Sequence, residues 1–366
     1  MGEPEPLAGF TIGVTADRRR DELSALLERR GARVVLAPAL RIVPLTDDSE
    51  LRAATLSCVD SPPDVVVATT GIGLRGWLEA AEGWGLAEAL RARLTSSYLI
   101  ARGPKARGAA RAAALAEAWA PDSESCDEVL DHLLASPGGV AGKRVAIQLH
   151  GEAQPDFCAA LRAAGADVVE VPVYRWAPPT DPAPLRRLVD LTANRLVDAV
   201  TFTSAAAVTY LLRAAGQDAA AVVDALRTDV LAACVGPVTA APLVKRGVPV
   251  AAPARARLGA LARTLVDELP RRARTLKIAG ASVTLRGHAA VVDGALRPLA
   301  PAPMAVLRAL AASPGRVLSR TALLPALPRG ADEHAVEMAV ARLRAALGGP
   351  AYVQTVVKRG YRLRVD

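Results

Sequence analysis

The sequence of 366 residues is poor in the residue types that build metal centres and disulfide frameworks. Its four cysteines and four histidines are scattered, with no Cys-x-x-Cys pair and no spacing typical of a metal site. We therefore expect reduced cysteines, no metal and no cofactor. No uninterrupted apolar run is long enough to cross a bilayer, and the acidic opening, residues 1–6, does not resemble a signal peptide. These absences predict a cytoplasmic protein without a membrane partner.

Positive charge is distributed unevenly along the chain. From residue 275 onward there are 13 lysine and arginine residues against 5 aspartate and glutamate residues, whereas the sequence before that point holds 32 of each kind. The whole net charge of +8 therefore belongs to the last quarter of the sequence. Such a surplus in one small module is expected where a protein contacts the phosphates of a nucleic acid.

The end of the chain has the pattern of an amphipathic helix followed by a β-hairpin. Apolar residues recur at steps of four, three and four over residues 332–347, which predicts a helix with Asp332 as its N-cap. Residues 352–365 then form two strand-like segments around a Lys-Arg-Gly tip. The plain interpretation of the polar helix face is a solvated surface of a small subdomain. That face holds His334, Met338, Ala341 and Ala345, flanked by Arg342.

Further motifs connect this helix to a known class of domain. They are Leu285-Arg286, Val292-Asp293-Gly294, the run from Pro314 to Arg320, Leu323-Leu324, Val336-Glu337, Arg342-Leu343-Arg344, Thr355-Val356 and the run from Gly360 to Leu363. With these motifs, residues 282–365 resemble the winged-helix DNA-binding domain of the OmpR/PhoB class. The resemblance implies double-stranded DNA as partner, with the helix in the major groove and the hairpin as the wing. The residues it assigns to DNA binding are His334, Met338, Ala341, Arg342, Arg344, Lys358, Arg359, Arg316 and Arg320.

Two features depart from that class. Positions that often carry base-reading side chains hold Ala335, Ala339 and Ala341, so direct readout of bases is expected to be sparse. The first long helix of the domain begins near Ala300 without the usual Ser or Thr cap.

The rest of the chain repeats itself. Residues 11–38 have the order strand, helix, turn, strand, and the same pattern returns at 145–172, where Val145 takes the place of Thr11. The same offset pairs residues 64–70 with 198–204 and, with a slip of one position, 101–104 with 234–237. Four matches in one register indicate that the first ~270 residues are a duplicated α/β unit.

Short apolar strands that alternate with helices predict parallel sheets covered by helices on both faces. Each strand ends in a small polar turn that opens a helix. Ligands of open α/β sheets bind at the carboxyl ends of strands, where helix N-termini offer free N–H groups to anions. Any one of these turns is better explained as an ordinary helix cap, but four equivalent turns in two repeats favour a shared site for an anionic ligand.

Three motifs give the duplicated region a family resemblance. They are the Asp-x-x-x-Phe-Thr-Ser run that ends at Ser204, the run from Gly236 to Ala240, and Val173-Tyr174. Residues 7–269 resemble the HemD family, uroporphyrinogen-III synthase. The resemblance implies an α/β fold with two flavodoxin-like lobes of parallel sheets. The OmpR/PhoB resemblance adds a C-terminal winged helix-turn-helix domain. The implied domains are residues 7–38 with 176–269, residues 44–170, and residues 275–366, with prolines marking the crossings at 38–44 and 172–179.

The family closes hydroxymethylbilane, a linear tetrapyrrole with many carboxylates, by losing water and inverting one ring. Tyr174 matches the tyrosine proposed to assist the leaving hydroxyl, and would be catalytic if this chain is an enzyme. The residues expected to line the ligand cleft are Thr15, Thr70, Gly71, Gly103, Lys105, Tyr174, Ser204, Ala205, Gly236, Pro237 and Thr239.

Three positions depart from the family pattern. Ala16 and His150 stand where the family usually has arginine, and Ala106 stands at the counterpart of Thr239. Since arginine is the best bidentate partner of a carboxylate, these changes should weaken recognition of an acidic substrate.

Three hypotheses about function remain open. The first is a transcription factor whose synthase-like domain senses a tetrapyrrole or another small anionic effector; no acidic pair follows the first strand, so a phosphoaspartate receiver is not expected. This architecture resembles actinobacterial HemD-like regulators, including those of nitrate and nitrite assimilation. The second hypothesis is a working uroporphyrinogen-III synthase with an accessory DNA-binding tail. In the third, the α/β region only docks another transcription regulator or RNA polymerase.

Overall fold

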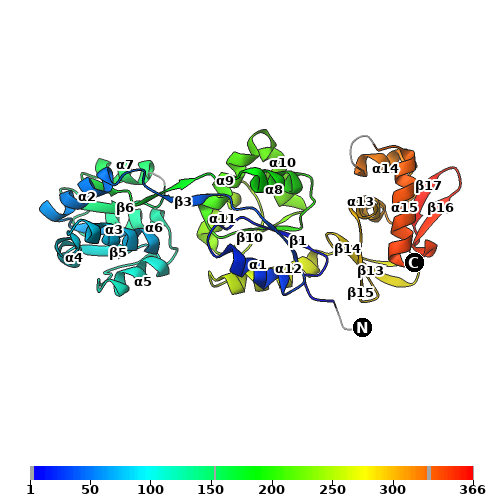
Figure 1. Ribbon diagram of the computed structural model, residues 1–366, viewed down its shortest axis with the longest axis horizontal. Helices are drawn as coiled ribbons and strands as arrows, with labels where there is room; N and C mark the ends of the chain where they lie inside the picture. Colours follow the sequence, from blue (N-terminus) through cyan, green and yellow to red (C-terminus); the bar gives the residue numbers. More distant parts are fainter. Residues whose placement is uncertain (1–3, 152–153, 328–330, 366) are drawn as a thin grey trace. The chain divides into compact units, whose positions relative to one another are not determined.

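The computed structural model describes residues 4–151, 154–327 and 331–365, so the first three residues of the acidic opening lie outside it. The chain divides into two compact units, Met1–Ala39 with Thr180–Asp366, and Leu40–Pro179. The first unit contains a first lobe (residues 4–39 and 180–272) and a C-terminal domain (residues 275–365); the second unit is the second lobe (Figure 1). No helix among the described residues has both the length and the apolar character needed to cross a membrane.

The first lobe has a five-stranded parallel sheet in the order β11-β10-β9-β1-β2. Its strands are β1 (Thr11–Val14), β2 (Arg33–Leu36), β9 (Ala199–Phe202), β10 (Leu231–Cys234) and β11 (Val250–Ala251). Its helices are α1 (Arg20–Glu28), α8 (Ala183–Ala193), α9 (Ala205–Ala215), η1 (Gly216–Asp218), α10 (Ala219–Thr228), α11 (Pro237–Val244) and α12 (Leu258–Arg272).

Helices cover both faces of this sheet because its strands are apolar on both sides. Val200 and Phe202 of β9 pack in a core with α8, α9, α10 and α11, whereas Ala199 packs on the opposite face with α1 and α12. A strand buried on both faces reads as a continuous apolar run, which is the pattern seen in the sequence.

The second lobe has a four-stranded parallel sheet in the order β5-β4-β6-β7. Its strands are β4 (Val65–Ala68), β5 (Tyr98–Ala101), β6 (Arg144–Gln148) and β7 (Asp167–Val171), and the separate pair β3 (Arg41–Pro44) and β8 (Tyr174–Ala177) is antiparallel. Its helices are α2 (Ser49–Asp60), α3 (Gly71–Gly83), α4 (Ala87–Ser96), α5 (Pro104–Ala112), α6 (Cys126–Ala135) and α7 (Pro155–Ala163).

The two sheets confirm the internal duplication. The offset found in the sequence, with its slip of one position, converts β10-β9-β1-β2 of the first lobe into β5-β4-β6-β7 of the second. Even the edge has a counterpart: β11 pairs with β10, and Trp119 forms an isolated parallel bridge with Ile100 of β5. The first lobe is therefore assembled from segments far apart in the chain, because β1 and β2 come before the second lobe and β9 and β10 come after it.

The C-terminal domain starts with an antiparallel sheet of β12 (Thr275–Ile278), β13 (Ala281–Leu285), β14 (Ala289–Val292) and β15 (Ala295–Pro298). Then follow α13 (Pro301–Ala312), α14 (Arg320–Leu323), η2 (Leu324–Ala326), α15 (Glu333–Leu347), η3 (Pro350–Tyr352) and the hairpin β16 (Val353–Val356) and β17 (Gly360–Leu363). The predicted helix and hairpin are confirmed: Asp332 accepts a hydrogen bond from the Ala335 N–H at 2.8 Å, and Gly348 ends the helix in the left-handed region. As expected, α13 begins without a side-chain cap at Ala300.

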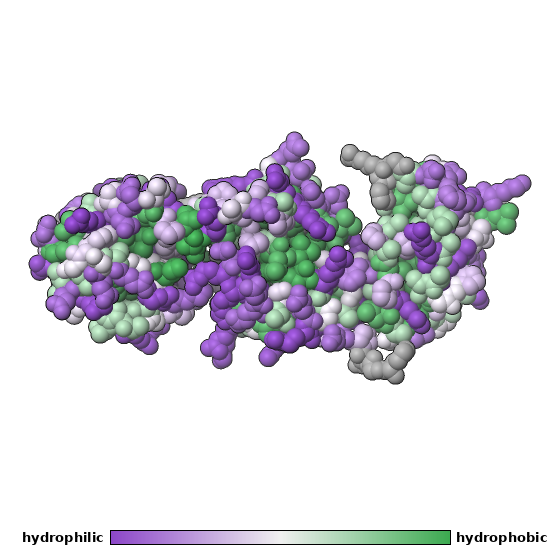
Figure 2. All heavy atoms as spheres, viewed as in Figure 1, coloured by the Kyte–Doolittle hydropathy of each residue, from purple (hydrophilic) through white to green (hydrophobic). Residues whose placement is uncertain are grey.

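The surface agrees with this division into buried and solvated faces. Figure 2 shows hydrophilic residues spread over the visible face, with apolar residues between them as patches. The apolar stripe of α15 is buried in the core of the C-terminal domain, so the face that remains on the outside of this helix is the polar one.

Candidate functional site

The turn from β4 to α3 brings three predicted site residues of the second lobe together. The Thr70 side chain caps α3 by accepting a hydrogen bond from the Gly73 N–H at 3.1 Å, and the Tyr174 hydroxyl lies 3.2 Å from the Thr70 hydroxyl. Gly71 is the first residue of the capped helix. The Thr70 N–H donates to the Gln148 side-chain oxygen at 3.0 Å. Thr70 therefore joins Tyr174 to the carboxyl end of the sheet.

Gln148 is a polar residue at this edge that belongs to none of the motifs seen in the sequence. Its side chain is fully buried at the end of β6, where it also lies near the Thr69 hydroxyl. Gly73 makes room for it, because a Cβ at Gly73 would lie 1.9 Å from the glutamine amide nitrogen. A polar residue directly after the apolar run 145–147 was the available signal, since a buried amide needs partners.

The turn from β5 to α5 lies at the same edge, because β4 and β5 are parallel neighbours. A Cβ at Gly71 would come 2.2 Å from the Lys105 carbonyl oxygen, so glycine is what lets the two turns approach each other. Gly103 starts α5 without a side-chain cap, Pro104 follows it, and Lys105 is exposed. Uncapped N–H groups beside a lysine favour an anion at this end of the helix, where the Glu124 carboxylate already lies 3.1 Å from the position of a Cβ at Gly103.

His150 stands beside these turns in a neutral form. Its ring nitrogens lie 3.3 and 3.5 Å from an Arg102 guanidinium nitrogen, and its ring meets Trp176 edge-on. Burial, together with the Arg102 charge, lowers the pKa of His150 to about 3. An imidazole that is neutral at pH 7 does not replace the positive charge of the arginine usual at this position.

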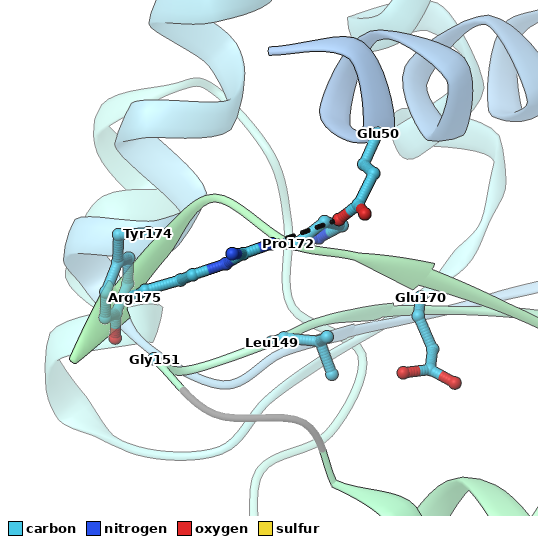
Figure 3. A pocket seen from close by; sticks show the side chains of 7 residues that line it. All are labelled: Glu50, Leu149, Gly151, Glu170, Pro172, Tyr174 and Arg175. Carbon is cyan, nitrogen blue, oxygen red and sulfur yellow. Dashed lines mark ion pairs between the residues drawn. The ribbon is translucent and has the colours of Figure 1, made fainter. Parts of the chain in front are cut away.

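A pocket of about 430 Å³ opens beside β8 in the second lobe (Figure 3). Among its described lining residues, Arg175 forms an ion pair with Glu50 at 3.5 Å. Glu170 adds a second carboxylate beside that of Glu50. The described lining therefore carries two carboxylates against one guanidinium, which does not suit a multiply carboxylated ligand. It is lined by Glu50, Leu149, Gly151, Glu170, Pro172, Tyr174 and Arg175.

The first lobe repeats this arrangement at the carboxyl end of its own sheet. Ser204 caps α9, which begins at Ala205, by accepting a hydrogen bond from the Ala207 N–H at 3.2 Å. Thr15 is buried, and its hydroxyl donates to the Thr201 carbonyl at 2.6 Å, so this group stabilises strand pairing. Its hydroxyl proton is already used within the lobe.

The other turn of the first lobe matches the uncapped helix of the second. Gly236 precedes α11 without a side-chain cap, Pro237 occupies its first turn, and Thr239 is buried close behind. At these equivalent turns, each lobe thus has a helix capped by a hydroxyl, α3 or α9, and a helix left open by a Gly-Pro pair, α5 or α11. The open pair supplies the free N–H groups that an anion needs.

Neither of the alanines that depart from the family pattern offers a polar group. Ala16 is the second residue after β1 and Ala106 lies in the first turn of α5, and both are buried. Among the described residues, no cluster of three or more histidine, cysteine or acidic side chains is arranged to hold a metal ion.

The outer face of α15 and the hairpin tip form the candidate nucleic-acid surface. His334, Met338, Ala341 and Arg342 are all exposed on the helix, as the periodicity predicts. Lys358 and Arg359 are exposed at the tip, beside Val357 with 78% of its surface accessible. Gly360 packs the end of the tip closely against the Leu318 backbone, because a Cβ at Gly360 would lie 2.0 Å from the Leu318 carbonyl oxygen.

Three further arginines differ in their surroundings. Arg344 donates to the Val353 carbonyl at 2.7 and 2.9 Å and to the Thr355 hydroxyl at 2.7 Å, so it ties α15 to the hairpin. Arg320 forms an ion pair with Glu337 at 2.7 Å. Arg316 lies in the loop before α14.

Comparison with known proteins assigns both parts. Residues 21–263 match the family "Uroporphyrinogen-III synthase HemD". The chain belongs to the HemD family. Residues 295–363 match the C-terminal domain of transcriptional regulatory proteins, which is the OmpR/PhoB-type DNA-binding domain. Both resemblances drawn from the sequence, and the α/β fold class, are confirmed.

Individual relatives cover the HemD-like domain. A mutant uroporphyrinogen III synthase of Thermus thermophilus is 30% identical, with a TM-score of 0.62 over 71% of this chain and 100% of its own. The wild-type Thermus enzyme is 31% identical, with a TM-score of 0.53 over 72% of this chain and 98% of its own. The uncharacterised protein YjjA of Bacillus subtilis (strain 168) is 30% identical over 70% of this chain and 94% of its own length.

Proposed function

We propose that this protein is a DNA-binding transcriptional regulator whose HemD-like domain binds a small anionic ligand in place of catalysing the synthase reaction. The observation that carries the proposal is the fusion itself: a HemD-like domain is followed by an OmpR/PhoB-type domain that holds all of the chain's surplus positive charge. A surplus of positive charge confined to that domain favours the phosphates of double-stranded DNA as its partner.

In this proposal α15 enters the major groove and the hairpin tip contacts the backbone. Arg342 lies on the exposed helix face and forms no ion pair within the part of the chain that the structure describes. Met338, 42% exposed, offers an apolar contact of the kind that suits a thymine methyl group. Lys358 and Arg359 provide charge without base specificity. We therefore expect binding that depends strongly on salt and reads few bases directly.

The salt dependence tests the proposal. Lys358→Gln with Arg359→Gln should make the negative slope of log K against log salt less steep, by about 0.9 for each lost phosphate contact and so by nearly two in total. Arg91→Gln with Lys245→Gln removes the same charge from exposed sites outside the C-terminal domain and should leave the slope unchanged. Fluorescence anisotropy with a labelled duplex measures both. Equal slopes for the two double variants would contradict the assigned wing.

The ligand half of the proposal rests on the turns of the two lobes. Uncapped N–H groups at α5 and α11, with Lys105 in the first turn of α5, suit a carboxylate or phosphate. Neutral His150 and buried Ala16 and Ala106 remove cationic and hydroxyl partners from positions where the family usually has them. We infer an anion that is smaller or less charged than the multiply carboxylated substrate of the enzyme. Failure to complement a synthase-deficient strain is the expected result.

One observation favours the alternative, a working synthase with an accessory DNA-binding domain. Tyr174 holds the position of the family's tyrosine, and its hydroxyl lies 3.2 Å from that of Thr70. If the full chain rescues the deficient strain and Tyr174→Phe loses the rescue, the domain is an enzyme.

The genes under control are also a proposal. We infer that they include genes of nitrate or nitrite assimilation, because the domain combination resembles regulators of that process. Genome-wide footprinting of the intact protein identifies the target genes. The absence of nitrate or nitrite assimilation genes among them would contradict the proposed role in nitrogen assimilation. DNA binding that ignores every tetrapyrrole and nitrogen metabolite tested would favour a HemD-like domain that only docks another regulator or RNA polymerase.

A further inference from the structure

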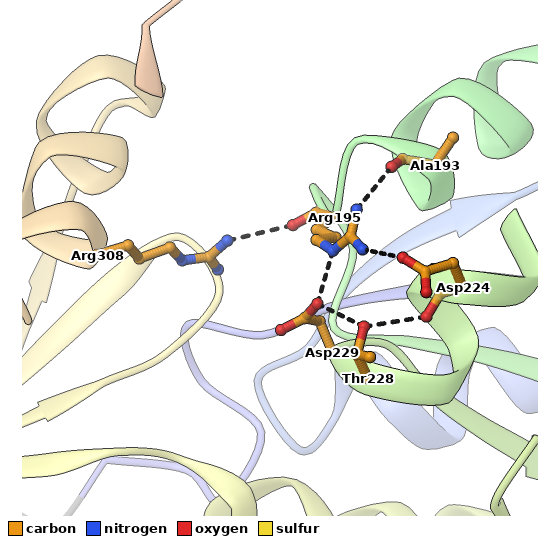
Figure 4. Close-up of polar contacts among 6 residues, drawn as sticks. All are labelled: Ala193, Arg195, Asp224, Thr228, Asp229 and Arg308. Atoms are coloured by element: carbon orange, nitrogen blue, oxygen red, sulfur yellow. Dashed lines mark hydrogen bonds and ion pairs between the residues drawn. The ribbon is translucent and has the colours of Figure 1, made fainter. Parts of the chain in front are cut away.

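Within the first unit, the DNA-binding domain is hydrogen-bonded to the amino-terminal ends of two strands of the first lobe. The His288 N–H donates to the Gly9 carbonyl at 2.8 Å, and the His288 ring lies 3.1 Å from the Thr11 hydroxyl. Arg308 of α13 donates to the Arg195 carbonyl at 3.1 Å (Figure 4). We call the contact formed by Thr11, Asp198, Gly287, His288 and Arg308 the strand-end junction.

A largely buried carboxylate lies at the centre of the strand-end junction. Asp198 accepts a hydrogen bond from the Thr11 N–H at 2.7 Å, and its other oxygen is 3.9 Å from the Arg308 guanidinium. The Asp198 side chain is only 15% exposed. A buried charge of this kind needs specific partners, and here one partner comes from each domain.

The junction is closely packed as well as polar. A Cβ at Gly287 would lie 1.8 Å from an Asp198 carboxylate oxygen, so the turn between β13 and β14 rests directly on this carboxylate. Asp198 has little freedom to move aside, because its displacement would break the bond to the Thr11 N–H. Arg308 completes the contact by donating to the Gly287 carbonyl at 2.9 Å.

The same two strands lead to the candidate ligand edge. Thr11 begins β1 and Asp198 directly precedes β9, whereas Thr15 and Ser204 follow the carboxyl ends of these strands. β1 and β9 are paired neighbours within the sheet, and the Thr15 hydroxyl bonds them together once more at that end. Four residues of strand span about 13 Å. The strand-end junction and the carboxyl edge are therefore joined by a short, buried pair of strands, held together by their backbone pairing and by the Thr15 hydroxyl.

We propose that the strand-end junction couples the DNA-binding domain to the carboxyl edge of the first lobe, so that occupancy of one surface changes the state of the other. This inference rests on the proposed DNA binding. Coupling between two sites is reciprocal. A ligand at the edge changes the affinity for DNA only if DNA changes the affinity of the edge for that ligand by the same free energy. DNA therefore serves as the probe, and the unidentified effector is not needed.

The test follows hydrogen exchange of the full-length protein with and without a 30-base-pair duplex of mixed sequence. The reporting amides are Thr15, which is bonded to the Thr201 carbonyl, and Ala207, which is bonded to the Ser204 hydroxyl. DNA should change their exchange rates by on the order of 5-fold, at the lower end of typical allosteric couplings. The duplex used is the same for every variant.

Two variants break the junction from different sides. Gly287→Ala inserts a methyl group against Asp198, and Arg308→Gln removes the partner charge. Both should bind the duplex yet lose the exchange response in the first lobe. Gly259→Ala is the matched control, because nothing lies within 4 Å of a Cβ at that glycine in α12. It should respond as the wild type does.

The outcomes separate this inference from the proposed function. A wild-type protein that binds DNA without any exchange response at Thr15 and Ala207 overturns the coupling and leaves the regulator intact. A response that persists unchanged in Gly287→Ala and Arg308→Gln also overturns it, because the junction would then not carry the effect. A protein that does not bind DNA at low salt fails the proposed function instead. Circular dichroism checks that each variant is folded.

Discussion

Asp198→Asn should stabilise the first unit at neutral pH, and the gain should shrink in acid. Burial raises the pKa of Asp198 to about 6 from an ordinary value of 3.8, in spite of the Thr11 N–H and the Arg308 charge, which act in the opposite direction. The native state therefore prefers the protonated carboxyl. The contribution of Asp198 to stability is greatest below pH 3.8, is lost as the pH rises to about 6, and is constant above that.

The size of the effect follows from the two pKa values. A gap of about two pH units corresponds to about 3 kcal/mol, the most that the ionised carboxylate costs at pH 7. At pH 4.5 most of this cost has disappeared, leaving about 1 kcal/mol. Asparagine is neutral at both values and keeps an oxygen for the Thr11 N–H. Its advantage over aspartate should thus fall by about 2 kcal/mol from pH 7 to pH 4.5, whatever the fixed cost of the exchange.

The positions of the tryptophans make the assay selective. All four, Trp77, Trp84, Trp119 and Trp176, belong to the second unit. In urea titrations, tryptophan fluorescence therefore follows the second unit, while circular dichroism follows both. Asp198→Asn should shift the unfolding of the first unit, which circular dichroism detects, and leave the fluorescence transition of the second unit unchanged.

Two results would refute the reasoning about Asp198. One is a difference between wild type and Asp198→Asn that does not change with pH, since that would mean the carboxyl has an ordinary pKa in the folded protein. The other is a shifted fluorescence transition, which would place the effect in the wrong unit. His288 has a pKa lowered by burial and, second, by Arg33, so its protonation destabilises the fold in acid; this effect is common to both proteins and cancels in the comparison.

The remaining predictions use the glycines of both units. Gly73→Ala should destabilise the second unit by about 2–3 kcal/mol, since its Cβ would lie 1.9 Å from the buried Gln148 amide nitrogen. Gly108→Ala, in an exposed helix position with nothing within 4 Å of the new Cβ, should stabilise the same unit by about 0.5–1 kcal/mol. Fluorescence-detected urea unfolding measures both variants. Changes of the same sign in the free energy of unfolding would contradict the packing at Gly73. Gly360→Ala should lower the stability of the DNA-binding domain by about 2 kcal/mol or more, because φ is +128° and the Leu318 carbonyl oxygen lies 2.0 Å from the added Cβ; an unchanged circular dichroism melt would show that the hairpin shifts without cost.

The sequence by itself determined the local elements and the repeat. Helix 333–347 follows from its apolar period and from Asp332, whose side chain needs only the adjacent turn to form a cap. The internal repeat revealed two copies of one α/β unit, because each copy must bury the same strand pattern between helices. The uncapped Gly-Pro turns at Gly103 and Gly236 were equally visible, since a cap depends on residues next to each other in the chain.

Only the tertiary structure decided which distant groups meet. Asp198 bonds to Thr11, from the opposite side of the second lobe in the sequence, and faces Arg308 from another domain. The same is true of Arg102, which helps to keep His150 neutral, and of Arg344, whose bonds tie α15 to the hairpin. Sequence periodicity does not predict such pairs. The protonation state of a group depends on its partners and its burial, and both depend on which distant segments the fold brings together.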